Sequence, residues 1–151
     1  MAPFTSYMQE ALREARAAAD RDETPVGAVI VDAAAGKVIA AAGNRTRELS
    51  DPTAHAEVLA IRAACALLGS ERLPGLDLYV TLEPCPMCAT AISFARIRRL
   101  YFGAYDPKGG GVEHGPAIFN QPTCHHAPET VGGVGEVEAA RMLRNFFGER
   151  R

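Results

Sequence analysis

Two short segments, about thirty residues apart, carry the side chains best suited to bind a metal ion. The first contains His55 followed by Glu57, and the second is a Pro-Cys-x-x-Cys sequence with sulfurs at Cys85 and Cys88. The C-x-x-C spacing lets two sulfurs share one zinc ion, and a histidine elsewhere can supply a third ligand. Three protein ligands leave one tetrahedral position open for water, which a catalytic zinc needs and a structural zinc lacks. We therefore predict a catalytic zinc bound by His55, Cys85 and Cys88.

Glu57 lies two residues beyond the predicted ligand His55. Two thiolates and a neutral imidazole cancel the formal charge of Zn²⁺, so the metal should acidify its water less than an all-histidine site would. A carboxylate beside that water can take its proton and pass it to a leaving group. We therefore predict that Glu57 is the proton shuttle and does not bind the metal.

Two predicted helix starts place these residues. Pro52 and Thr53 indicate a helix from about Thr53 to Leu68, with Thr53 or Asp51 able to cap it. A second, short helix is expected from Pro86 through Arg96, because proline suits the first helical position. Both sulfurs would then lie at a helix N-terminus, where the dipole and free amides favour thiolates.

The rest of the chain predicts alternating helices and strands. We expect helices at 5–21 and 134–147, strands at 26–31, 37–42, 76–82 and 100–102, and loops at 44–52 and 106–111. This alternation is typical of an α/β domain whose central sheet is covered on both faces. We predict one domain over residues 1–151, with no element or site assigned over 113–128.

Four further residues carry weaker signals. Cys65 lies among alanines and leucines and is expected to be a small buried hydrophobe. Cys124, His125 and His126 form a run of metal-ligand types, but without a C-x-x-C partner they are a weak metal site, and loop packing or substrate contact is favoured.

Composition bounds the class of protein. The chain has 151 residues, of which 48% are hydrophobic and 23% charged, as in an ordinary globular domain. We find no apolar run of bilayer length and no secretory signal, so we expect a cytoplasmic protein without a membrane span, whose thiols stay reduced. The net charge of -2 means that any nucleic acid must bind to a local basic patch.

The two metal-binding segments are specific only in combination. A lone C-x-x-C is often a redox pair or half of a structural zinc site, and a lone H-x-E is usually a helix surface. The combined order H-x-E then P-C-x-x-C is the signature of zinc-dependent nucleobase deaminases. This combination favours catalysis.

Over almost its whole length the sequence resembles the bacterial tRNA-specific adenosine deaminases, within the cytidine-deaminase-like superfamily. The resembling segments are 24–29, 43–45, 51–57, 79–85, 93–97, 102–106 and the Phe-Phe pair at 146–147. The resemblance implies a three-layer α/β/α fold with a five-stranded mixed sheet, a homodimer and one zinc per subunit. It also implies hydrolytic deamination of the wobble adenosine to inosine in a tRNA anticodon loop, with zinc-bound hydroxide as the attacking group.

The resemblance assigns further residues to the substrate. The implied substrate contacts are Asn44, Ala56, Glu83, Asp106 and Lys108, with Asn44 bonding the purine and Asp106 and Lys108 in the loop that grips the flipped nucleotide. The C-terminal helix of the family helps to bind RNA, and the matching residues are Arg144, Phe146, Phe147, Arg150 and Arg151.

Two other hypotheses stay open at this point. The first is a deaminase of a free base or nucleoside such as guanine or cytosine, because 56–62 and Pro-Cys-Pro-Met-Cys recur almost unchanged in bacterial guanine deaminases. Against it, arginines cluster at 45–47, 96–99 and 141–151, beside the motifs. The second is a non-catalytic module with a structural zinc, for which Cys124 is the only cysteine plausibly free to be a fourth ligand.

Overall fold

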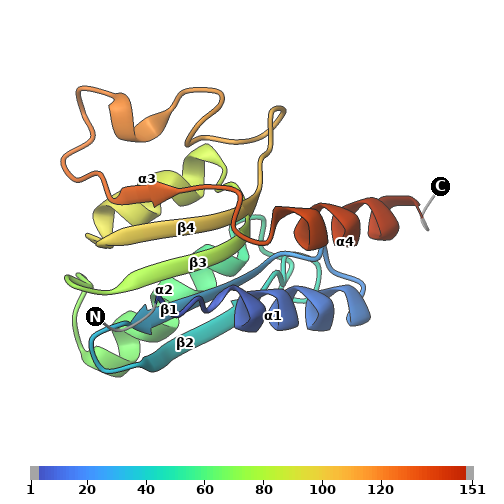
Figure 1. Cartoon of the computed structure of the whole chain (residues 1–151), viewed down its shortest axis with the longest axis horizontal. Helices are drawn as coiled ribbons and strands as arrows, with labels where there is room; N and C mark the ends of the chain where they lie inside the picture. Colours follow the sequence, from blue (N-terminus) through green and yellow to red (C-terminus); the bar gives the residue numbers. More distant parts are fainter. Residues whose placement is uncertain (1–3, 149–151) are drawn as a thin grey trace.

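Five strands form one mixed sheet in the computed structural model, which describes residues 4–148 (Figure 1). Its order is β2-β1-β3-β4-β5. β1 is antiparallel to both β2 and β3, whereas β4 is parallel to β3 and β5. The strands are β1 (Gly27–Asp32), β2 (Lys37–Gly43), β3 (Asp77–Leu82), β4 (Arg99–Ala104) and β5 (Glu129–Val131).

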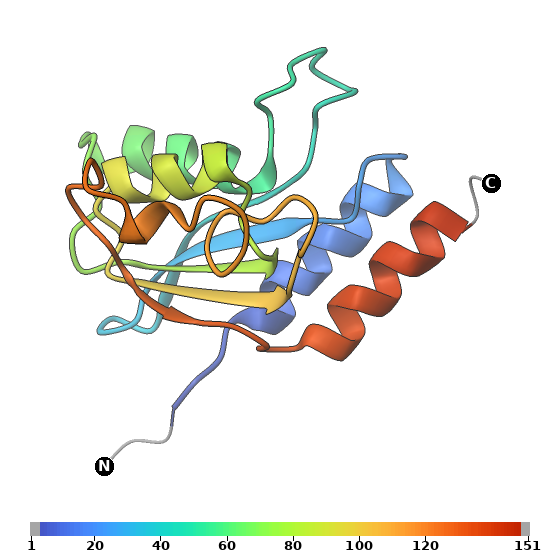
Figure 2. The same ribbon diagram turned by 90° about the horizontal axis from the view of Figure 1, so that it is seen from above.

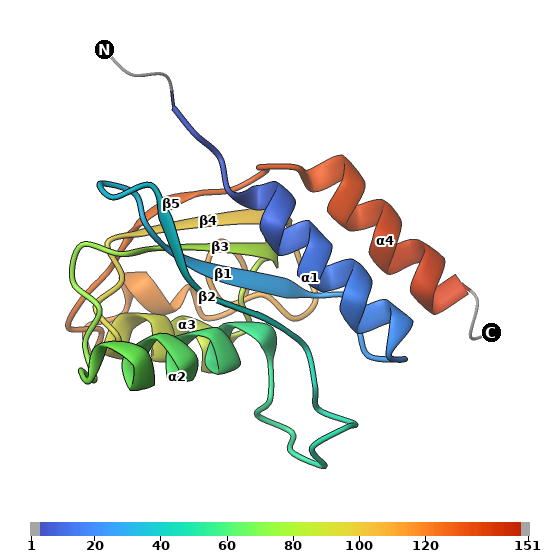
Figure 3. The same cartoon turned by 90° about the horizontal axis from the view of Figure 1, so that it is seen from below.

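Helices cover both faces of this sheet (Figures 2 and 3). On one face α1 (Met8–Asp20) packs on β1 and β3, and α4 (Glu136–Gly148) packs on β4. On the other face α2 (Ala56–Leu68) packs on β1 and β2 and contacts α3 (Pro86–Phe94), which contacts a 3-10 turn, η1 (Ile118–Asn120). The predicted three-layer fold with a five-stranded mixed sheet is confirmed.

The central strands read as continuous apolar runs because both of their faces are buried. In β1, Ala28 and Ile30 belong to the core beneath α2 and α3, while Val29 and Val31 belong to the core beneath α1 and α4. The amphipathic pattern of α1 matches this second core, since its buried residues recur every three or four positions: Met8, Ala11, Leu12, Ala15 and Ala18.

The start of α2 differs from the prediction. The helix begins at Ala56, and His55 is its N-cap, with an extended backbone at φ −74° and ψ 151°. Asp51 does not cap the helix, because its Oδ1 accepts hydrogen bonds from the Thr53 N–H and hydroxyl at 2.9 and 2.7 Å. Because of this polar turn, α2 begins three residues later than predicted, and His55 lies at its N-terminus.

The end of α3 also comes earlier than expected. The helix stops at Phe94 rather than Arg96, because the backbone of Arg96 is left-handed with φ 61°. The segment 113–128 contains only η1 as regular structure, and the short edge strand β5 follows it. No helix among residues 4–148 is both long and apolar enough to span a bilayer.

Candidate metal centre and active site

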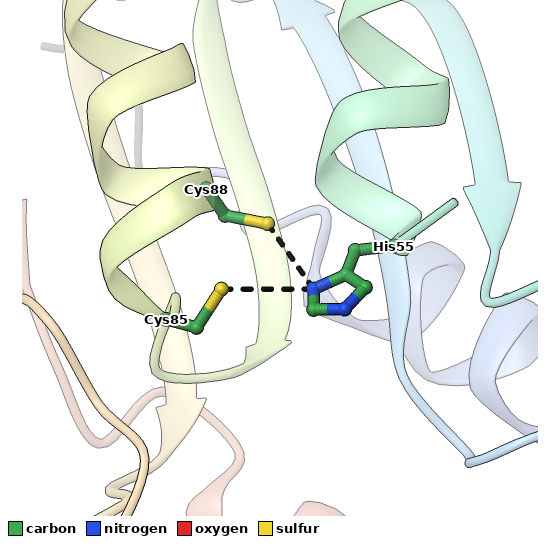
Figure 4. Close-up of side chains that lie close together, drawn as sticks. All are labelled: His55, Cys85 and Cys88. Atoms are coloured by element: carbon green, nitrogen blue, oxygen red, sulfur yellow. Dashed lines mark hydrogen bonds between the residues drawn. The ribbon is translucent and has the colours of Figure 1, made fainter. Parts of the chain in front are cut away.

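The N-terminal ends of α2 and α3 bring three ligand side chains together (Figure 4). His55 is the N-cap of α2, Cys85 is the N-cap of α3, and Cys88 lies in the first turn of α3. Pro86 occupies the first helical position between the two cysteines, as predicted. The imidazole points across the gap between the helices toward both sulfurs.

The distances in this cluster fit a tetrahedral zinc ion. His55 Nδ1 lies 3.6 Å from Cys85 Sγ and 3.5 Å from Cys88 Sγ, and the three donor atoms all lie within 4.8 Å of one another. Zinc binds sulfur at about 2.3 Å and nitrogen at about 2.0 Å, so a tetrahedral ion separates an S and an N ligand by roughly 3.6 Å. One cation bound by all three atoms would give both distances.

Within residues 4–148, no fourth side chain joins this cluster. The Cys124 thiol instead donates to the His126 carbonyl at 3.2 Å and lies 3.4 Å from Ser93 Oγ. His126 Nε2 contacts the Ile97 carbonyl oxygen at 2.7 Å. Cys124 and His126 therefore make loop-packing contacts, and the four-ligand structural zinc is not supported.

The two sulfurs differ in their affinity for protons. A hydrogen bond from the Cys88 thiol, together with His55, lowers the pKa of Cys85 to about 4 against the opposing effect of burial. The same bond and burial raise the pKa of Cys88. Cys85 is thus held as a thiolate, and Cys88 gives up its proton when a cation binds.

Glu57 lies in the first turn of α2 and is only 4% exposed. Burial is the main cause that raises the pKa of its carboxyl to about 7, and the charge of Cys85 adds to it. Its carboxylate is not part of the three-residue cluster. A carboxyl with a pKa near neutrality can both accept and return a proton, as general acid–base catalysis requires.

A cavity of about 340 Å³ opens onto the cluster. Its volume lies within the usual range for small-molecule sites. The residues that line it come from the segment before β1, the segments after β2 and β4, the end of β3 with the residues after it, and the start of α2: Thr24, Val26, Asn44, Thr46, His55, Glu57, Leu82, Glu83, Cys85, Asp106 and Gly109.

Three of the predicted substrate residues line this cavity. Asn44 is 8% exposed, and its backbone is fixed by a hydrogen bond to Val26 and by the Arg21 guanidinium, which donates to its carbonyl at 3.2 Å. Asp106 lies opposite, in the loop after β4. Glu83 also borders the cavity, but both carboxylate oxygens accept hydrogen bonds from the chain itself, so they are committed to the protein.

The other two predicted substrate residues are placed differently. The Ala56 side chain packs in the core, so a substrate contact would have to come from its backbone N–H. Lys108 is exposed and is not among the residues that line the cavity. The cavity also contains Thr24, Val26, Thr46, Leu82 and Gly109, which were not singled out because each is an ordinary strand or loop residue in the sequence.

The predicted RNA-binding residues on α4 divide into two groups. Arg144 and Phe147 are exposed. Phe146 is buried, at 7% exposure, so its ring is not displayed on the surface of the helix, and its RNA contact stays a prediction. Arg150 and Arg151 lie outside the described residues.

Comparison with known families decides the class of the site. Residues 2–104 match the model of the cytidine and deoxycytidylate deaminase zinc-binding region. This chain belongs to that deaminase family. The matched residues include His55, Glu57, Cys85 and Cys88, and the geometry of the cluster fits the zinc ion that this family binds. The predicted zinc cofactor is confirmed.

The relatives of this deaminase point to a narrower group. The tRNA-specific adenosine deaminase of Agrobacterium fabrum is 65% identical over 151 residues, which cover 100% of this chain and 98% of that protein. A solved chain from work on A-to-I editing by tRNA:A34 deaminases at the wobble position matches with a TM-score of 0.88 and 66% identity, over 91% of this chain and 98% of that one. The guanine deaminase of Bacillus subtilis matches with a TM-score of 0.65 and 32% identity, over 95% and 91%. The resemblance seen in the sequence is confirmed.

Proposed function

We propose that this deaminase converts the wobble adenosine of a tRNA anticodon loop to inosine. The observation that carries the proposal is the sequence identity to the tRNA:A34 deaminase, which is 66%, against 32% for the guanine deaminase of Bacillus subtilis. An anticodon loop is already single-stranded, which lowers the cost of extruding the target base into a cavity.

In this proposal His55, Cys85 and Cys88 hold one zinc ion. The bound ion would supply Lewis acidity that lowers the pKa of a water molecule at the open position. The extended backbone of His55 and the first turn of α3 orient the three ligands before any metal arrives, because both helix ends are fixed by the core.

Glu57 moves the protons. Its carboxylate takes a proton from water and gives it to N1 of the purine while the water oxygen bonds to C6. It then takes the second proton from that oxygen and delivers it to the amino nitrogen, so the C–N bond breaks and ammonia leaves with the keto base behind. Burial keeps the carboxyl out of bulk water, and its pKa of about 7 suits both halves of this transfer.

The wall of the cavity orients the nucleotide. We assign hydrogen bonding of the purine to the Asn44 side chain and the backbone N–H of Ala56. Asp106 and the exposed Lys108 would contact the sugar and phosphate at the mouth of the cavity. Glu83 acts on the same nucleotide only through the loop that it holds.

The wider surface would bind the rest of the anticodon stem-loop. We propose that Arg144 and Phe147 on α4, with Arg150 beyond it, contact the RNA. We further propose that residues 1–151 work as one deaminase domain, that two copies form a homodimer, and that the enzyme acts in the cytoplasm, where tRNA is found.

A direct test is inosine formation in an anticodon stem-loop RNA with a wobble adenosine. Free adenine, guanine, cytosine and their nucleosides are assayed in parallel, each with and without a zinc chelator. We expect inosine in the stem-loop alone, and none after chelation. Turnover of free guanine with an inert stem-loop would instead assign this chain to base salvage, the alternative that the guanine deaminase match supports.

A further inference from the structure

The loop after β4 is organised around one buried carboxylate. Glu83 follows β3 directly, and its side chain is completely buried. Its Oε1 accepts from the Asp106 N–H at 3.0 Å, and its Oε2 accepts from the N–H groups of Val112, Glu113 and His114 at 3.2, 2.9 and 3.2 Å. All four amides belong to the segment 106–114, which we call the clamp loop.

The His114 side chain closes this loop. Its Nδ1 lies 2.8 Å from Glu83 Oε1, the same oxygen that the Asp106 N–H reaches, so the two ends of the clamp loop meet at one atom. The ring also packs edge-on against Tyr105, with centroids 6.3 Å apart at 79°. Because an ionised carboxylate only accepts, Nδ1 is the protonated nitrogen.

The clamp loop packs closely against residues 84–86, which include the predicted metal ligand Cys85. The Gly111 N–H donates to the Pro84 carbonyl at 2.8 Å. A Cβ on Gly110 would collide with the Glu83 carboxylate, and one on Gly111 would lie 2.6 Å from the backbone of Pro86. Only glycine therefore allows the loop to approach Glu83 and the start of α3 this closely.

Two residues proposed to contact the nucleotide depend on this packing. Asp106 Oδ1 accepts from the N–H groups of Lys108 and Gly109 at 3.3 and 2.9 Å, which folds the tip of the loop back onto the Asp106 side chain. Asp106 and Gly109 line the cavity, and Lys108 lies between them in sequence. The position of this tip is therefore set by the anchor at Glu83.

We propose that His114 is a positioning residue for the substrate: it locks the clamp loop onto Glu83 and thereby holds Asp106 and Lys108 at the mouth of the cavity. The inference rests on the proposed function for the identity of the substrate. His114 supplies the one side-chain donor among the described hydrogen bonds to Glu83, since the other four donors are backbone amides.

The test compares three variants of the full-length, zinc-loaded chain. His114→Ala removes the donor, His114→Asn restores an N–H at nearly the same reach, and His125→Ala is a matched control at an exposed histidine outside the cavity lining. A hydrogen bond to a charged group contributes on the order of a tenfold factor or more. We expect His114→Ala to raise KM for the stem-loop roughly tenfold with little change in kcat or zinc content, and His114→Asn to recover most of this loss.

Hydrogen exchange gives a second readout that does not depend on activity. In His114→Ala we expect faster exchange at the amides of Asp106, Val112 and Glu113, with His125→Ala unchanged. Unaltered KM and unaltered exchange would overturn the proposal, and so would a loss of kcat that follows a loss of zinc. A wild-type chain that does not edit the stem-loop would overturn the proposed function instead, while exchange would still decide whether His114 holds the loop.

Discussion

At the scale of single residues, the buried position of Glu57 separates its role from that of the metal ligands. It shares a cavity with His55 and Cys85 but is not part of the donor cluster. We expect Glu57→Gln to keep stoichiometric zinc and to lose about 10²-fold or more in editing rate, because the amide cannot shuttle a proton. Inosine formation and metal analysis on the same preparation measure both quantities. Loss of zinc together with activity would make Glu57 a ligand and would refute the assignment.

Glu83 is a second single residue with a testable role, because its ionisation makes the stability of the fold depend on pH. Burial by itself would raise the pKa of its carboxyl, but hydrogen bonds from the clamp-loop amides and from His114 outweigh burial and hold that pKa below its ordinary value of 4.5. A group whose pKa is lower in the folded chain stabilises the fold above its unfolded pKa and loses that contribution as the pH falls through its folded pKa.

The measurement for Glu83 is urea unfolding of the wild type and Glu83→Gln across pH 7 to 3. Chelator is present throughout, so that zinc release does not contribute. We expect the variant to be less stable by about 1–3 kcal/mol at pH 7, where its amide leaves clamp-loop donors poorly satisfied. The difference should shrink below about pH 4.5, where Glu83 of the unfolded wild-type chain begins to take up a proton while the carboxyl of the folded chain stays ionised. A difference that is constant with pH would contradict the assigned ionisation.

Site residues could be predicted where their partners lie close in sequence, and they were missed where the partner lies far away in sequence. Cys85 and Cys88 share one helix start, and a histidine followed by Glu57 is a recognisable partner. His114 carries no local signal, because its partner Glu83 lies 31 residues away in sequence. Asp51 and Thr53 misled for the opposite reason: their polar side chains suit a helix cap, but here they bond to each other and end a turn.

At the scale of elements, the approach of the clamp loop to α3 depends on glycine. We expect Gly111→Ala to destabilise the fold by about 1–3 kcal/mol, because its Cβ would meet the backbone of Cys85 and Pro86, which cannot move without shifting a metal ligand. Thermal unfolding and zinc affinity should both fall. Gly148→Ala is the control, since a Cβ there has no heavy atom within 4 Å. Equal thermal stability and zinc affinity in the two variants would show that the backbone at Cys85 can shift to make room for the added Cβ.

Helices and strands with a two-sided core were predictable to within a few residues, whereas β5 was not. The apolar residues of β1 alternate between the two cores, and those of α1 lie along one face of the helix, so both patterns indicate which side is buried. β5 has three residues, no residue classed as buried, and a parallel pairing with β4 that begins at Arg99 opposite Glu129. Such a short edge strand is set by its neighbour rather than by its own sequence.

At the scale of the whole molecule, the charge of the chain constrains how RNA could bind. The net charge of -2 gives no general attraction to a polyanion, so affinity must come from a local surface. Arg144 is exposed on α4 and lines a groove with Tyr105, the residue that precedes Asp106. This groove also contains Glu136, which would repel phosphate, so the contribution of Arg144 is the one that should decide binding there.

We therefore expect Arg144→Ala to weaken stem-loop binding at low salt and to reduce the slope of log Kd against log salt by about 1, the change for one lost phosphate contact. Lys37→Ala removes the same charge from the exposed start of β2, on the sheet edge opposite β4 and α4, and should change neither quantity. Binding titrations at several salt concentrations measure both variants. Equal slopes for both would mean that α4 does not touch the phosphate backbone. The RNA surface would then have to be sought along the arginines of the 44–52 loop, whose residues Asn44 and Thr46 line the cavity.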